Sequence, residues 1–134
     1  MAFCLDTDII IEFFRGNPKV VQKITEKIEL KDHLYLTHFS LCELFRGAYL
    51  SQNPEKELVK IRTLLKACRV LPLTTNSCEK FGLISAQLIK EGKTVQDMDL
   101  LIGCIALSFG YILVTNNKKH FQRITNLKIE SWLE

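Results

Sequence analysis

The chain has 134 residues, with 18 Lys and Arg against 15 Asp and Glu and a net charge of +3. Hydrophobic residues make up 47% and charged residues 25%, which is typical of one globular domain and excludes a disordered chain. This small positive charge permits a polyanionic partner without requiring one. No stretch approaches the roughly 20 apolar residues of a membrane span, so we expect no membrane segment.

Strands and helices are expected to alternate along the chain. The strands are predicted from short apolar runs at residues 2–5, 34–37, 69–73, 111–114 and near 128–130. The helices are predicted from apolar residues at helical spacing, from residue 7 or 8 to 14 and at 19–29, 40–49, 54–67, 75–91 and 97–109. This order predicts an α/β layered fold with a mainly parallel sheet over residues 1–134. In such sheets ligands bind beyond the carboxyl ends of the strands.

The five cysteines are odd in number and form no Cys-x-x-Cys pair, which argues against a disulfide framework and a zinc-thiolate site. The N-terminus has neither the basic segment nor the apolar core of a secretory signal. Together these features predict a cytoplasmic protein whose cysteines are free thiols.

Three acidic residues stand out by their position. Asp6 directly follows the first strand, where it could serve a site or cap the next helix. Glu43 shares a helix face with Ser40 and Gly47, small residues that suit the border of a cleft, although a solvated surface Glu is the alternative. Asp99 lies on the apolar stripe of the helix at 97–109, and a carboxylate entering a core needs a partner.

Asp97 lies two residues from Asp99 and therefore points about 200° away on the same helix. We expect Asp99 to belong to the site and Asp97 to be a cap or a peripheral ligand. Carboxylates converging at one sheet edge repel each other unless protons or cations offset their charge. Oxygen ligands select hard ions, Mg²⁺ or Mn²⁺, and such ions support hydrolysis of phosphodiesters.

Four segments, in their order and approximate spacing, resemble the motifs of PIN domains, and most closely those of the VapC toxins of type II toxin–antitoxin operons. They are Leu5-Asp6-Thr7-Asp8, Leu41-Cys42-Glu43-Leu44, Asp97-Met98-Asp99-Leu100-Leu101-Ile102-Gly103, and Val114-Thr115-Asn116-Asn117 with His120-Phe121. The resemblance covers the whole chain. It implies a three-layer α/β/α sandwich and a metal-dependent endoribonuclease that cuts tRNA or ribosomal RNA.

The resemblance also implies roles for individual residues. Asp6, Glu43 and Asp99 correspond to the acidic metal ligands and catalytic residues of the family, and Thr115 to the hydroxyl beside them. A fourth acidic position falls at Asn117, which brings no charge; Asp97 would partly compensate for it as a ligand. The implied cofactor is Mg²⁺, with Mn²⁺ as a substitute.

The resemblance further implies a homodimer and a cognate antitoxin whose C-terminal segment lies in the active-site groove. Arg15 and Arg46 are the candidates for contact with antitoxin and RNA, since each lies about a turn beyond an acidic motif. The apolar residues from Leu58 to Leu65 suit either an interface or the core.

Further RNA contacts are expected from basic residues near the last motif: Lys93, Lys118, Lys119, His120 and Arg123. Solvated surface charges are the alternative for all of them. The three histidines lack ligand spacing, and only His38 is placed to act as a general base.

Two other functions fit the same fold: a housekeeping RNA-processing nuclease, and a protein-binding module without catalysis. The first more often carries extra domains, such as a zinc ribbon, and this chain has none. The intact Asp6, Glu43 and Asp99 argue against the second. Nucleotide binding is excluded by the lack of a Gly-x-Gly-x-x-Gly or P-loop motif.

Overall fold

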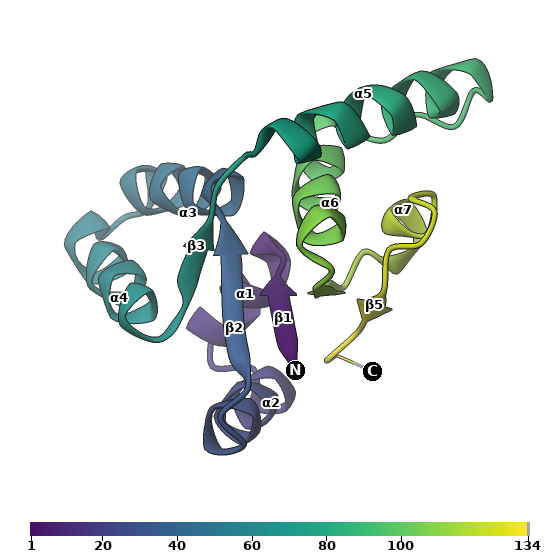
Figure 1. Cartoon of the computed structure of the whole chain (residues 1–134). Coiled ribbons are helices and arrows are strands. Elements are labelled where there is room, and N and C mark those ends of the chain that lie inside the picture. Colours follow the sequence, from purple (N-terminus) through teal and green to yellow (C-terminus); the bar gives the residue numbers. More distant parts are fainter. Residues whose placement is uncertain (134) are drawn as a thin grey trace.

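Strands and helices alternate as predicted in the computed structural model of the chain, which describes residues 1–133 (Figure 1). In chain order the elements are β1 (Ala2–Leu5), α1 (Thr7–Phe14), α2 (Pro18–Glu29), β2 (His33–Thr37), α3 (His38–Leu50), α4 (Pro54–Ala67), β3 (Arg69–Leu71), α5 (Thr75–Lys90), α6 (Asp97–Phe109), β4 (Ile112–Val114), α7 (Lys118–Phe121) and β5 (Ile129–Glu130). Within these residues no helix is both long and apolar enough to cross a membrane.

The described residues form one five-stranded sheet in the order β3-β2-β1-β4-β5, and every neighbouring pair is parallel. Along the chain, β2 and then β3 are added on one side of β1, and β4 and then β5 are added on its other side. The direction of the strand order therefore reverses between β1 and β4. In open parallel sheets this reversal point is where ligands bind.

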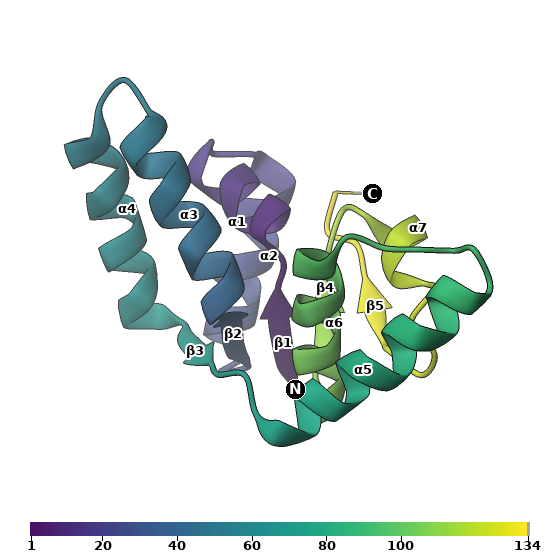
Figure 2. The same ribbon diagram turned by 90° about the horizontal axis from the view of Figure 1, so that it is seen from above.

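Helices cover both faces of the sheet, so the expected three-layer α/β/α sandwich is confirmed (Figure 2). One core lies between the sheet and α1 to α4, where Leu58, Ile61 and Leu64 are buried. These three α4 side chains thus pack into the core rather than into an interface. The second core lies between the sheet and α5 to α7, around Ile102 and Phe121.

Helix ends follow the local sequence. Asn17 and Asn53 cap α2 and α4 with their side chains, and in both helices Pro occupies the first turn, where its missing N–H costs nothing. Gly110 ends α6 with φ +73°, a left-handed conformation that glycine adopts without strain. These signals explain why most helix boundaries agree with the sequence prediction.

Two predictions differ from the structure. The strand predicted at 69–73 ends at Leu71, because Pro72 has no N–H to continue the pairing with β2. The short helix α7 was not predicted, since four residues are too few to show a helical period. It is held in place by Phe121, which is fully buried against α6.

Candidate active site

Asp6 lies at the reversal point of the sheet, directly after β1. Leu5 pairs with Val114 of β4, and the Asp6 N–H donates to the Val114 carbonyl at 2.9 Å, so Asp6 stands beside Thr115. The Asp6 side chain is buried and also caps α1, accepting from the Thr7 N–H at 2.8 Å. Asp6 therefore caps α1, and its place at the reversal point is also the one that the predicted site role requires.

Thr115 orients the Asp6 carboxylate. Its Oγ1 donates to Asp6 Oδ2 at 2.8 Å and accepts from the Asn117 N–H at 2.9 Å. The accepted bond leaves the single hydroxyl hydrogen free to point at Asp6. Thr115 is fully buried, so this arrangement is shielded from competing water.

Asp8 is a third member of the cluster and was not predicted as a site residue. It lies in the first turn of α1, and its Oδ2 accepts from the Asn116 N–H at 3.0 Å. Burial, together with the negative charges of Asp8 and Asp99, raises the pKa of Asp6 to about 7, although the hydrogen bonds from Thr115 and Thr7 lower it in part. Burial also raises the pKa of Asp8, to which Asp99 again contributes.

Asp99 reaches the same site from the first turn of α6. Its side chain is half-buried, and burial raises its pKa while the nearby His120 partly lowers it. Asp97, by contrast, is exposed and lines a small hollow against α5. Gln96, not Asp97, is the N-cap residue of α6, so the expectation of Asp97 as a cap is wrong.

Glu43 joins the site through Thr7 rather than by direct contact with Asp6. Thr7 Oγ1 donates to Glu43 Oε1 at 2.7 Å and lies 2.9 Å from Ser40 Oγ. Ser40 is buried, while Glu43 is half-exposed and lines a groove of about 310 Å³ between α1, α3 and α4. Gly47 lines the same groove, as expected from small residues beside Glu43.

A family model described as the PIN domain matches residues 3–127. The chain belongs to the PIN-domain family. It is 35% identical over 132 residues to Ribonuclease VapC1 of Haemophilus influenzae (strain R2866), and the aligned residues cover 98% of each chain. It is 33% identical over 133 residues to the tRNA(fMet)-specific endonuclease VapC of Shigella flexneri, again covering 98% of each chain. The structure of VapBC-1 from nontypeable Haemophilus influenzae matches with a TM-score of 0.90 and 34% identity over the full length of both chains.

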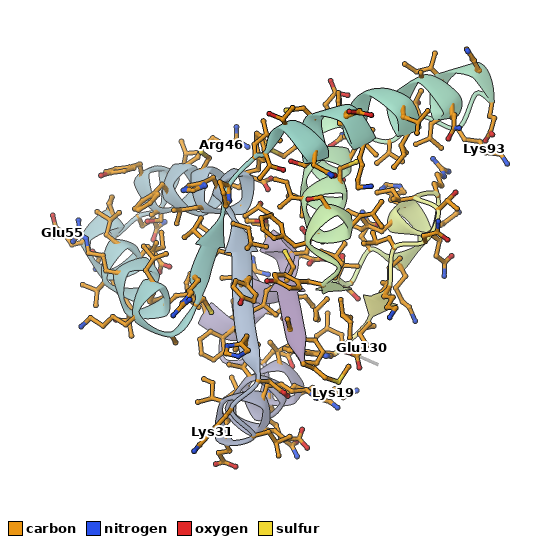
Figure 3. All side chains as sticks on the ribbon, viewed as in Figure 1. Lys19, Lys31, Arg46, Glu55, Lys93 and Glu130 are labelled. Atoms are coloured by element: carbon orange, nitrogen blue, oxygen red, sulfur yellow. The ribbon has the colours of Figure 1, made fainter. Side chains whose placement is uncertain are left out.

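The predicted basic residues of this PIN domain divide into two groups. Lys118 and Lys119 open α7 directly after the turn that holds Asp6 and Asp8, and Arg15 lines the groove beside Glu43. Arg46 projects outward from α3, and Lys93 lies at the far end of α5, away from the strands (Figure 3). His38 is exposed at the start of α3, whereas His120 lies near enough to Asp99 to lower the pKa of that carboxyl.

The residues of the PIN site fit a hydrated magnesium ion. Among residues 1–133, no three acidic, His or Cys side chains already surround a common metal position. Mg²⁺ commonly keeps several waters and binds through one or two carboxylates, so a preformed cage is not needed. Asp8 Oδ1 is buried and has no hydrogen-bond partner in the described chain, which leaves an oxygen suited to a cation.

Sequence reasoning identified Asp6, Glu43 and Asp99 but gave no role to Thr7 or Asp8, and it expected His120 to contact RNA rather than to lie near Asp99. Thr7 and Asp8 carried a signal, because they follow Asp6 in the first turn of a predicted helix. His120 carried none, since its approach to Asp99 depends on how α7 packs against α6. The Asn117 amide nitrogen donates to His120 Nδ1 at 2.9 Å.

Proposed function

We propose that this PIN domain is a metal-dependent endoribonuclease and the toxin of a toxin–antitoxin pair. The observation that carries the proposal is the meeting of Asp6 and Asp8, at the start of α1, with Asp99 from the distant α6 where the strand order reverses. A cluster of carboxylates at this position requires a cation or protons to offset its charge. The mild basic excess around α7 then suits a polyanionic substrate.

Asp6 and Asp99 are the residues that would hold Mg²⁺, or Mn²⁺ in its place, and Glu43 borders them. When bound there, the ion would supply Lewis-acid activation of water and of the scissile phosphate. Thr115 fixes the orientation of Asp6, and Thr7 fixes that of Glu43. Lys118 and Lys119 contribute positive charge for the phosphates that flank the cut.

RNA is the proposed substrate because the similar proteins are named ribonuclease and tRNA(fMet)-specific endonuclease. A tRNA or a ribosomal RNA is therefore the substrate to test first. Arg46 projects outward from α3 and Lys93 lies past the end of α5, so we assign them to flanking parts of a folded RNA rather than to the cut phosphate. Contacts of this kind read the shape of an RNA.

The antitoxin is proposed to bind the groove between α1, α3 and α4. The related VapBC-1 structure supports a partner of this type. The groove has apolar walls such as Phe14 and Ile61, and it carries Arg15 beside Glu43. A protein segment lying there would cover Glu43 and block the approach of RNA, with Arg15 and Arg46 as contacts.

We further propose that the toxin is a cytoplasmic homodimer, as the family resemblance implies. Large apolar side chains outside the core support an interface, and Tyr49 and Leu50 at the end of α3 are 66% and 80% exposed. Sedimentation analysis of the antitoxin-free protein tests the dimer. A monomer at all concentrations would contradict it.

The test of the nuclease is cleavage of purified tRNA and ribosomal RNA by the antitoxin-free protein, with Mg²⁺ and then with EDTA. The products are mapped by sequencing of their ends. We expect discrete internal cuts that need the metal. Cleavage that is equal in EDTA, or degradation from the ends only, would contradict a metal-dependent endonuclease.

A further inference from the structure

The side chain of Asp8 is only half used by the protein itself. Its Oδ2 accepts one hydrogen bond, from the Asn116 N–H at 3.0 Å. Its Oδ1 is buried and has no partner among residues 1–133. Buried carboxylate oxygens are normally paired or bound to a metal, so Oδ1 requires an explanation.

One turn of the chain holds Asp6 and Asp8 together. Thr115 donates to Asp6 Oδ2 and the neighbouring Asn116 N–H donates to Asp8 Oδ2, while the Thr7 N–H holds Asp6 Oδ1. Both carboxylates are thus fixed by donors from the backbone or from a buried hydroxyl. These donors hold the two carboxyl groups at the same end of the sheet.

The ionised groups around Asp8 do not neutralise it. Asp6 and Asp99 are themselves acidic; the Asp99 charge raises the pKa of Asp8, while the contact with the Asp6 carboxyl lowers it. The ion pairs that join residues 1–133 involve other carboxylates, those of Glu12, Asp32 and Glu57. His120 lies near Asp99 and offsets only part of the charge.

Asn117 does not supply the missing ligand charge. Its amide nitrogen is engaged with His120 Nδ1, and a neutral amide carries no charge in any case. Asp8 is therefore a further carboxylate, besides Glu43, that could complete the site together with Asp6 and Asp99.

We infer that Asp8 is a direct ligand of the divalent cation, and that its charge replaces the one that Asn117 lacks. The inference rests on the metal dependence proposed above. It predicts that Asp8 contributes to metal affinity and does more than anchor Asn116.

The decisive variant is Asp8→Asn, because its amide oxygen can still accept from the Asn116 N–H while the charge is lost. The matched control is Asp97→Asn, which removes the same charge from an exposed side chain in the first turn of α6. Binding of Mn²⁺ alone to the full chain is measured by calorimetry and by electron paramagnetic resonance. Circular dichroism confirms that each variant is folded.

We expect Asp8→Asn to weaken Mn²⁺ binding at least tenfold and Asp97→Asn to change it less than twofold. A metal-free Asp8→Asn protein should also melt at a higher temperature than the wild type, because a repulsive charge is gone. Binding within twofold of the wild type, or an equal loss in Asp97→Asn, would overturn the inference.

The Asp99→Asn variant separates this inference from the proposed function. If Asp99→Asn abolishes Mn²⁺ binding and Asp8→Asn leaves it intact, only the role of Asp8 is wrong. If the wild type itself binds no Mn²⁺, the metal-dependent function fails, and the inference about Asp8 with it.

Discussion

At the scale of single residues, Thr115 shows how one hydroxyl can set the geometry of a carboxylate. Its accepted bond from the Asn117 N–H leaves one direction for its hydrogen, toward Asp6 Oδ2. Thr115 thus positions Asp6 in the structure, and its place in the catalytic set, which the family resemblance implies, stays a prediction.

Thr115→Val should lower RNA cleavage by roughly ten- to a hundredfold, the loss typical when a residue supporting a metal ligand is removed. Valine keeps the shape of threonine but cannot donate. Thr115→Ser should restore most of the activity, because it returns the hydroxyl. Rates of cleavage of a labelled RNA check this; if Thr115→Val cleaves as fast as the wild type, the orienting role is wrong.

The buried Asp6 should make the metal-free protein sensitive to pH. Its pKa is about 7 in the folded chain, against 3.8 for the model carboxyl. The folded state therefore holds the proton that the unfolded state releases, and stability falls as pH rises from about 4 to about 7. Asp6→Asn should remove this part of the pH dependence.

Melting temperatures in EDTA between pH 4.5 and 8 check the expectation, with the wild type and Asp6→Asn compared at each pH. The wild type should lose stability relative to the variant across this range, and Mg²⁺ should restore it above pH 7. Two parallel curves would show that Asp6 has an ordinary pKa.

The residues of the site differ in how well the sequence predicts them. Asp6 and Asp99 were found because each sits at a recognisable place, after a strand or on an apolar helix stripe. Asp8 was missed because its importance depends on Asn116, which is distant in sequence and brought close only by the pairing of β1 with β4.

At the scale of elements, the packing of α6 against α7 depends on Gly103. A Cβ at Gly103 would overlap the side chain of Ile124 and press on Phe121 at 3.2 Å. Gly103 therefore permits the close approach that keeps α7, with its basic residues, beside Asp99.

Gly103→Ala should destabilise the protein by about 1–3 kcal/mol, the usual cost of overpacking a core. Gly82→Ala is the control, because Gly82 lies within α5 with nothing within 4 Å of its Cβ position. That change should be neutral or stabilise by up to about 1 kcal/mol through helix propensity. Urea denaturation of both variants checks this, and an equal effect would contradict the packing argument.

Elements with a clear period or a strong stop signal were predicted almost to the residue, as α4 and α6 show. The errors lie where tertiary contacts decide. Pro72 shortened β3, and buried Phe121 stabilised a helix too short to have a period of its own.

At the scale of the molecule, the groove beside Glu43 continues past the site. A second, more apolar groove of about 350 Å³ lies between α1, α2 and α4 and shares Phe14 and Lys60 with the first. The layered fold followed from the alternation of strands and helices, but these grooves did not. They depend on the spacing of α1 from α4, which no local pattern encodes.

Gly47→Leu should weaken antitoxin binding at least tenfold, because its side chain would occupy the groove where a Cβ now meets nothing within 4 Å. The fold should persist, since leucine favours a helix more than glycine does. Gly82→Leu on α5 is the control outside the groove. Biolayer interferometry with the proposed antitoxin measures both; equal affinities would place the antitoxin elsewhere.

The most direct test of the whole account compares Asp99→Asn with Asp97→Asn in an RNA cleavage assay with Mg²⁺. The two variants lose the same charge from the same helix turn, but only Asp99 is placed beside Asp6. The account predicts that Asp99→Asn loses at least a hundredfold in rate while Asp97→Asn stays within threefold of the wild type. Equal cleavage rates in the two variants, whether both are near the wild type or both are strongly reduced, would contradict a nuclease site built on Asp6, Asp8 and Asp99.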